Sequence, residues 1–211
     1  MKAVVFGGAE IHDYAVCRPY LEGAYVVCCD NGLSHAKALG ILPDCIVGDF
    51  DSADQETIDF FTGKHIPIRT FPTHKDETDM ELGLDAAMEA GATEVVIFGG
   101  IGSRLDHTLA NVHYLLYLLR HGVKAKLVNE HNVVQLTDDV VHLEGKAGDL
   151  VSTLPLSPQV TGITTKGLEY PLDCATLSLD DRLIAVSNVM LSKQAEISVE
   201  QGYLLVMQCR D

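Results

Sequence analysis

The sequence predicts an α/β protein: an N-terminal three-layer, Rossmann-like domain with a parallel sheet, followed by a C-terminal all-β sandwich. In the first two-thirds of the chain, short apolar runs alternate with helix-like stretches, which is typical of a parallel sheet with right-handed crossovers. After about Asn132, strand-like segments follow one another at close spacing with no helix pattern, which is typical of a small sandwich or barrel. We therefore expect two domains, residues 1–135 and 136–211.

The strands of the first domain are predicted from short apolar runs rich in β-branched residues. Such continuous runs fit parallel strands that are buried on both faces. Most of them stop at glycine or aspartate, as at Gly7, Asp30 and Gly99. The predicted strands cover residues 2–6, 24–29, 44–47, 94–98 and 125–128.

Two helices are predicted between these strands. Thr78 and Glu81 have the spacing of a capping box, and an apolar face follows them. Ser103 is the predicted cap of the second helix, which stops at Gly122. The apolar stripe expected to cover the sheet consists of Leu105, Leu109, Val112, Leu116 and Leu119.

Eight strand-like pieces make up the predicted sandwich. Gly, Pro, Asp and Asn separate them. They cover residues 132–136, 140–143, 150–154, 160–164, 175–179, 183–186, 195–199 and 204–208.

Composition excludes several classes of protein. The chain has 15 Lys and Arg against 30 Asp and Glu, a net charge of -15 that argues against nucleic-acid binding. It has no apolar run of the roughly 18 residues that a membrane span needs, and its first residues do not form a signal peptide. The six cysteines contain no C-x-x-C pair and no disulfide spacing, so we expect a cytoplasmic protein.

The acidic residues crowd into the segment 44–106, where nine Asp and five Glu face two Lys and two Arg, a net charge of -10. A solvated acidic surface explains such a segment, and so does a site that holds a divalent metal or attracts a cationic substrate. The second interpretation gains weight because polar clusters follow the predicted strands, at the end of the sheet where ligands bind.

The segment 48–52 (GDFDS) is the clearest of these clusters. In an extended chain Asp49 and Asp51 point to the same side, and Mg²⁺ commonly takes one or two carboxylates together with phosphate oxygens. The structural alternative is a helix start capped by Asp51 or Ser52.

Three further clusters have both a binding and a structural interpretation. Segment 30–32 (DNG) can contact a ligand or form an Asx turn. Segment 75–79 (KDETD) places a lysine beside acids that suit a phosphate and its metal, or a helix dipole. Segment 99–107 (GGIGSRLDH) offers glycine N–H groups and Arg104 to a phosphate, whereas Asp106 can instead cap a helix reciprocally with Ser103. Together the clusters predict a metal-dependent phosphoryl-transfer site.

Read in order, these motifs resemble the bacterial form of the thiamine pyrophosphokinase family. The resemblance also includes segment 167–172 (GLEYPL) and Ser187-Asn188, so it covers nearly the whole chain. It implies a homodimer with the active site near the subunit interface, which transfers the diphosphoryl group of ATP to thiamine with Mg²⁺. The chain has no Trp, and Tyr170 stands where many relatives place one.

The resemblance implies a role for each motif residue. The catalytic residues are Asp49, Asp51, Asp79 and Asp106, of which Asp49, Asp51 and Asp79 hold the metal. The nucleotide or its phosphates contact Asp30, Asn31, Gly32, Ser52, Lys75, Asp76, Thr78, Gly100, Arg104 and His107. Thiamine contacts Tyr170, Ser187 and Asn188.

Two other functions stay open at the level of sequence. One is a related pyrophosphokinase that acts on another small alcohol, such as a pterin. The other is a non-catalytic sensor of thiamine or nucleotide, whose signature would be the loss of a motif acid, and all four acids are present.

Overall fold

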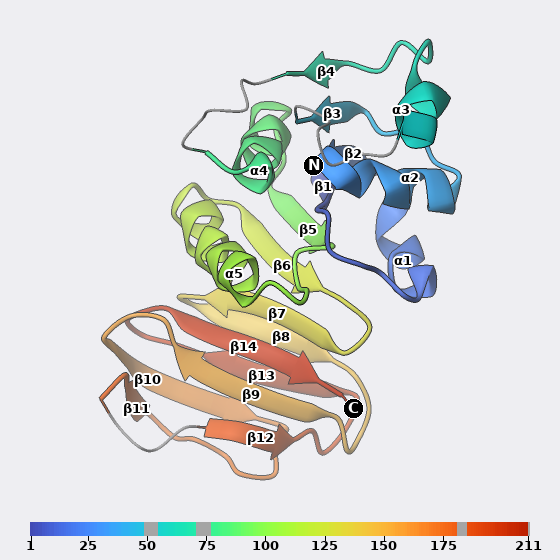
Figure 1. Cartoon of the computed structure of the whole chain (residues 1–211). Helices are drawn as coiled ribbons and strands as arrows, with labels where there is room; N and C mark the ends of the chain where they lie inside the picture. Colours follow the sequence, from blue (N-terminus) through green and yellow to red (C-terminus); the bar gives the residue numbers. More distant parts are fainter. Residues whose placement is uncertain (49–54, 71–76, 181–184, 211) are drawn as a thin grey trace. The chain divides into compact units, whose positions relative to one another are not determined.

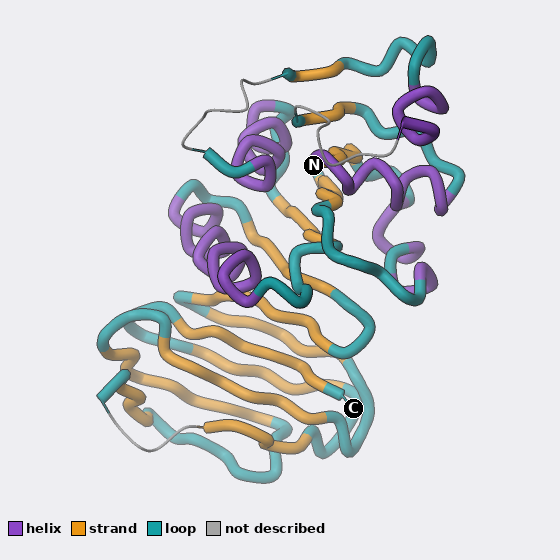
Figure 2. Tube along the Cα trace, in the orientation of Figure 1, coloured by secondary structure: helices purple, strands orange, loops and turns teal. Residues whose placement is uncertain are grey.

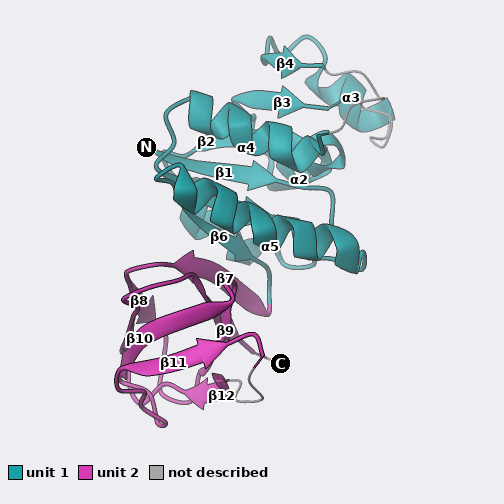
Figure 3. Ribbon diagram, turned by 90° about the vertical axis from the view of Figure 1, so that its left-hand side faces the viewer, with its two compact units in different colours: residues 1–130 teal, residues 131–211 magenta. Residues whose placement is uncertain are grey.

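The computed structural model describes residues 1–48, 55–70, 77–180 and 185–210. Its chain divides into two compact units, residues 1–130 and 131–211 (Figure 3). Among the described residues the helices all belong to the first unit, and the second consists of strands and loops (Figure 2). The change from alternating α/β to all-β structure is therefore confirmed. Residue 135, the expected boundary, falls inside β7 (Asn132–Thr137).

The first unit contains a parallel sheet with the strand order β6-β5-β1-β2-β3-β4 (Figure 1). All five predicted strands are present. Strand β4 was not predicted, because its two residues are too few to leave a pattern in the sequence. The strands are β1 (Lys2–Phe6), β2 (Tyr25–Cys29), β3 (Cys45–Val47), β4 (Ile68–Arg69), β5 (Glu94–Phe98) and β6 (Lys124–Val128).

Helices α2 (Leu33–Leu39) and α4 (Asp79–Glu89) pack on opposite faces of this sheet. Neighbouring residues of a strand point to opposite faces, so Val5 and Phe6 identify the two sides. Gly83 of α4 lies over Val5 and Cys29, where a Cβ atom would collide with the Cys29 sulfur. On the other face, the ring of Phe6 lies 6.0 Å from the ring of His35 in α2.

The two predicted helices are present, together with shorter ones that the sequence analysis did not identify. Thr78 caps α4, because its side chain accepts a hydrogen bond from the Glu81 N–H at 3.2 Å. The α-helices are α1 (Arg18–Leu21), α2 (Leu33–Leu39), α3 (Gln55–Phe61), α4 (Asp79–Glu89) and α5 (Leu105–Arg120), with 3-10 turns η1 (Tyr14–Val16) and η2 (Asp30–Gly32).

Two predictions for α5 are wrong. Its N-cap is Arg104, and no side chain caps it, so neither Ser103 nor Asp106 forms the expected reciprocal cap. The residues it buries are Asn111, Leu115 and Leu118, and two members of the predicted stripe are mostly exposed, Leu105 at 66% and Leu109 at 53%. Leucines lie on two sides of this helix, so apolar spacing alone did not identify the side that faces the sheet.

The second unit contains two sets of four antiparallel strands, in the orders β12-β9-β14-β7 and β11-β10-β13-β8. All eight predicted segments overlap a strand. One buried cluster draws on both sets, including Val151 and Val206 from the first and Ile163 and Ile197 from the second, so the sets enclose a common core. Besides β7, the strands are β8 (Val140–Glu144), β9 (Leu150–Pro155), β10 (Gln159–Lys166), β11 (Ala175–Ser178), β12 (Ala185–Val189), β13 (Gln194–Ser198) and β14 (Leu204–Cys209).

Candidate functional site

The loops that follow β1, β2, β3 and β5 meet at the carboxyl end of the parallel sheet, and we call them the strand-end rim (residues 7–9, 30–32, 48 and 99–102). Register places Phe6 opposite both Cys28 and Phe98, so the loops after these strands begin side by side. The Gly7 N–H donates to the Phe98 carbonyl at 2.8 Å, and the Ala9 N–H donates to the Gly99 carbonyl at 3.0 Å. The β1 and β5 loops therefore continue the sheet pairing beyond the strands.

The predicted cluster 30–32 is part of this rim. Asp30 has a left-handed backbone (φ 48°) and opens the 3-10 turn η2 directly after β2. Gly32 lies so close to the Phe6 carbonyl that a Cβ atom would overlap it. A Cβ on Gly8 would lie 3.4 Å from the Cβ of Asn31, and one on Gly48 would lie 3.2 Å from Asp30. The structure thus brings the DNG segment together with the loops after β1 and β3.

Five predicted site residues lie outside the described residues. They belong to the GDFDS and KDETD segments, whose neighbours Gly48 and Glu77 are described. Gly48 follows β3 with a φ of 144° and donates its N–H to the Arg69 carbonyl at 3.2 Å, so the first segment begins at the rim. The five residues are Asp49, Asp51, Ser52, Lys75 and Asp76.

Asp79 begins α4 and is half-buried, and it lies near the same thiol as Asp30. Burial raises the pKa of the Cys29 thiol, and the carboxylates of Asp79 and Asp30 raise it further. Carboxylate oxygens are the donors that Mg²⁺ prefers, so the Asp79 carboxylate is of the chemical type that a metal site needs. In the part of the chain that is described, no three His, Cys, Asp or Glu side chains cluster as metal ligands.

Thr78 has a structural role in addition to any ligand contact. Besides capping α4, its hydroxyl lies 3.0 Å from the hydroxyl of Tyr114 in α5. The Tyr114 hydroxyl in turn donates to Glu81 at 3.2 Å. Thr78 therefore links the start of α4 to the middle of α5 through side-chain hydrogen bonds.

Arg104 and Asp106 form an ion pair at the start of α5. The Arg104 Nη2 donates to Asp106 Oδ2 at 2.6 Å, and both side chains are mostly exposed. The hydrogen bond from Arg104 lowers the pKa of Asp106 to about 2. The Asp106 carboxylate is therefore charged at neutral pH, and it is held beside the guanidinium. His107 is exposed in the first turn of the same helix.

The three residues predicted to contact thiamine lie together in the second unit. The Asn188 side chain accepts a hydrogen bond from the Tyr170 N–H at 3.0 Å and donates one to the Tyr170 carbonyl at 2.7 Å. Ser187 has a left-handed backbone (φ 58°), and its N–H donates to the Ser152 hydroxyl at 3.0 Å. The Tyr170 side chain is 63% exposed, so its ring is available to a ligand.

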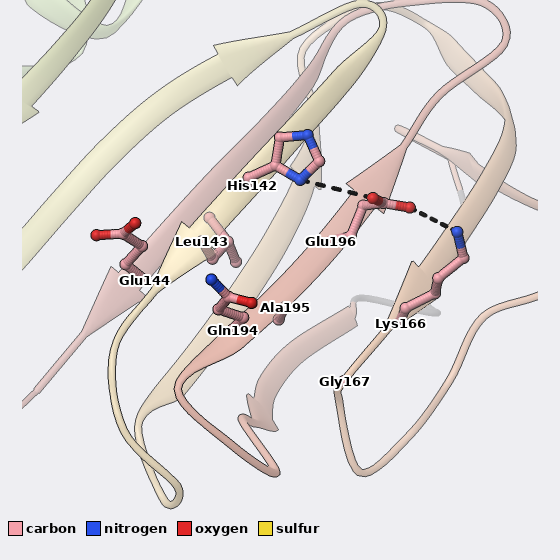
Figure 4. A pocket seen from close by; sticks show the side chains of 8 residues that line it. All are labelled: His142, Leu143, Glu144, Lys166, Gly167, Gln194, Ala195 and Glu196. Atoms are coloured by element: carbon pink, nitrogen blue, oxygen red, sulfur yellow. Dashed lines mark hydrogen bonds and ion pairs between the residues drawn. The ribbon is translucent and has the colours of Figure 1, made fainter.

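A separate hollow of about 290 Å³ lies on the other set of strands of this unit, over β8, β10 and β13 (Figure 4). Glu196 accepts a hydrogen bond from Lys166 at 2.7 Å, and His142 Nδ1 lies 3.5 Å from its other oxygen. These are exposed pairs between neighbouring strands, and Tyr170, Ser187 and Asn188 are not among the residues that line the hollow.

Sequence reasoning missed two buried polar side chains beside the strand-end rim. Asn111 is 7% exposed and donates to the Gly100 carbonyl at 2.7 Å. His35 is 5% exposed and contacts the Ala9 carbonyl at 3.0 Å. Each interrupts a helix face that is otherwise apolar, and that is the signal by which they could have been found.

None of the helices in the described residues is long and apolar enough to cross a membrane.

Comparisons with known proteins agree on one family. The family model for the catalytic domain of thiamin pyrophosphokinase matches residues 18–127, and the model for its vitamin B1 binding domain matches residues 136–204. Thiamine pyrophosphokinase of Bacillus subtilis is 28% identical over 186 residues, which are 86% of each chain.

Solved structures give the same result. The crystal structure of thiamine pyrophosphokinase from Bacillus subtilis has a TM-score of 0.90 and 25% identity, with all of both chains covered. That of Geobacillus thermodenitrificans has a TM-score of 0.87 and 27% identity, and the match covers all of this chain and 98% of the other. The chain belongs to the thiamine pyrophosphokinase family.

Proposed function

We propose that this protein transfers the diphosphoryl group of ATP to the hydroxyl group of thiamine and releases AMP. The observation that carries the proposal is the match of both family models, catalytic and vitamin B1 binding, in order along the chain. In the reaction the thiamine hydroxyl oxygen bonds to the β-phosphorus of ATP. The bond from that phosphorus to the oxygen it shares with the α-phosphorus breaks, the oxygen leaves with AMP, and the hydroxyl proton is released.

The two units divide the substrates in this proposal. Residues 1–135 form a Rossmann-like nucleotide domain, in which the strand-end rim receives the phosphates. Residues 136–211 form the thiamine domain, in which the exposed Tyr170 ring stacks on the substrate. The protein acts as a cytoplasmic homodimer with the active site near the subunit interface.

Mg²⁺ belongs to the proposal as the metal held by Asp49, Asp51 and Asp79. Bound there, it would neutralise negative charge on the phosphates. Asp30, at the start of η2 and beside Gly48, adds a further carboxylate to the rim. The carboxylate of Asp106 is charged and available as a hydrogen-bond acceptor, because the pKa of Asp106 is about 2.

The test is incubation of the protein with ATP, Mg²⁺ and thiamine, followed by chromatography of the thiamine compounds and nucleotides. The proposal predicts thiamine diphosphate and AMP in equal amounts, and no AMP when thiamine is omitted. Formation of ADP without thiamine, or transfer to a pterin alcohol in place of thiamine, would contradict it.

A further inference from the structure

His35 connects three elements beside the strand-end rim. It lies on α2, where its Nε2 is 3.0 Å from the Ala9 carbonyl and its Nδ1 is 2.8 Å from the Tyr14 hydroxyl. A carbonyl can only accept a hydrogen bond, so Nε2 carries a proton, and in the neutral ring, which burial favours, Nδ1 accepts from Tyr14. Neutral His35 therefore holds the loop after β1 from one side and receives the Tyr14 hydroxyl on the other.

Asn111 holds the loop after β5 in the same way. It lies on α5, is nearly buried, and its Nδ2 donates to the Gly100 carbonyl at 2.7 Å. A Cβ on Gly100 would lie 2.7 Å from Leu127 and 3.0 Å from Ile97, so this stretch of backbone sits tightly on the core. Asn111 thus fixes the direction of the peptide at Gly100.

The two anchored loops are neighbours. The Ala9 N–H donates to the Gly99 carbonyl, and a Cβ on Gly102 would lie 2.7 Å from the Ala9 Cβ. In the sheet β1 lies beside β5. Strands β2, β3 and β4 follow β1 in one direction, and β5 and β6 follow in the other, so the strand order reverses between β1 and β5. In open parallel sheets that is where a ligand binds.

These two side chains contribute to stability as well as to direction. Each one satisfies a backbone carbonyl, which an apolar residue in its place would leave without that partner. What a hydrogen bond adds is direction, because it fixes one carbonyl and hence the neighbouring N–H groups. His35 and Asn111 each orient one of the two loops, after β1 and after β5, that border the reversal of the strand order.

We propose that His35 and Asn111 are positioning residues that hold the backbone of the strand-end rim in the shape that receives the phosphate groups of the nucleotide. The proposal rests on the proposed function, since it concerns the nucleotide half of the same site. It adds two buried residues and the loop 7–9 to that site, and none of them contacts the reacting atoms.

The experiment compares His35→Leu and Asn111→Leu with the unchanged protein. Steady-state kinetics gives kcat and the KM values for ATP and thiamine, and calorimetry gives the Kd of ATP with Mg²⁺. We expect the KM and Kd for ATP to rise about tenfold, because a misdirected carbonyl displaces the phosphate-binding backbone. The KM for thiamine should stay within about twofold.

Matched controls separate positioning from loss of stability. Leu39→Ala in α2 and Leu115→Ala in α5 remove buried side chains from the same helices. They should lower the melting temperature and leave the KM for ATP unchanged. His35→Gln retains a donor near Nε2, so it should restore most of the ATP affinity.

The outcomes decide the proposal in each case. An unchanged KM and Kd for ATP in both leucine variants, or an equal rise in the alanine controls, would overturn it. If the leucine variants do not fold, Asn111→Ala, which removes the donor without adding bulk or charge, should bind ATP about tenfold more weakly. If the unchanged protein forms no thiamine diphosphate, the proposed function fails, and the calorimetric comparison still tests the two residues.

Discussion

Asn188 holds the loop that carries Tyr170, and its removal should loosen that loop. Its Oδ1 accepts hydrogen bonds from the N–H groups of Tyr170, at 3.0 Å, and Val189, at 2.9 Å. Its Nδ2 donates to the Tyr170 carbonyl at 2.7 Å. Asn188→Ala deletes all three hydrogen bonds. Asn188→Asp keeps the acceptor and loses the donor.

The size of the effect follows from the number and exposure of these bonds. Each contributes about 0.5–1.5 kcal/mol, so three give at most about 4.5 kcal/mol. Asn188 is half-buried and Tyr170 is exposed, so water replaces part of what is lost. We expect the free energy of unfolding to fall by about 1.5–2 kcal/mol in Asn188→Ala and by about 1 kcal/mol in Asn188→Asp.

The assay combines urea unfolding with fluorescence. The chain contains no Trp, so Tyr170→Trp introduces a single reporter on the loop. With Asn188→Ala added, the anisotropy of that reporter should fall and its quenching by thiamine should weaken. Ser192→Ala is the control, because among the described residues its hydroxyl bonds to the backbone of Gln194 alone, in a nearby turn. Equal stability of the Asn188 and Ser192 variants, with unchanged anisotropy, would refute the reasoning.

Three further predictions concern the first unit. Burial lowers the pKa of His35 below 6.5, so on acidification the unfolded chain takes up a proton at this residue before the folded chain does. The free energy of unfolding should therefore fall as the pH drops below about 6.5, by up to about 1.4 kcal/mol per pH unit. Urea unfolding between pH 8 and pH 5 measures this, and His35→Gln should remove this part of the pH dependence. Arg104→Gln should raise the pKa of Asp106 from about 2 toward 3.8, which NMR titration of the carboxyl carbon measures; an unchanged pKa would exclude the ion pair as its cause. Gly99→Ala should lower the free energy of unfolding by more than about 2 kcal/mol, because φ is 62° and the new Cβ would collide with the Gly7 carbonyl. Gly122→Ala, where φ is 76° and the space around the new Cβ is open, should lower it by about 1 kcal/mol. Equal losses in the two variants would contradict the close approach of Gly99 to Gly7.

The strands were predictable because their signal is local. Runs such as 95–98 (VVIF) are apolar throughout, and glycine or aspartate marks the ends of most of them. The faces of the helices were less predictable. Helix α5 has leucines on two sides, and its sheet-facing side is identified by Asn111, whose partner Gly100 is eleven residues away.

Some of the residues that the motifs singled out do lie together in the structure. Tyr170, Ser187 and Asn188 were singled out from two separate segments, and the structure joins Tyr170 to Asn188 by two hydrogen bonds. Ser103 failed as a cap because the helix begins two residues after it, at Leu105. His35 escaped notice because its partners, Ala9 and Tyr14, come together with it only through the pairing of β1 with β2.

The central claim is the transfer of an intact diphosphoryl group to thiamine, and isotope tracing tests it most directly. With ATP labelled in the γ-phosphate, the account predicts that the label appears in the terminal phosphate of thiamine diphosphate, with unlabelled AMP as the only new nucleotide. Labelled thiamine monophosphate together with ADP would show stepwise transfer of single phosphoryl groups and would contradict the account.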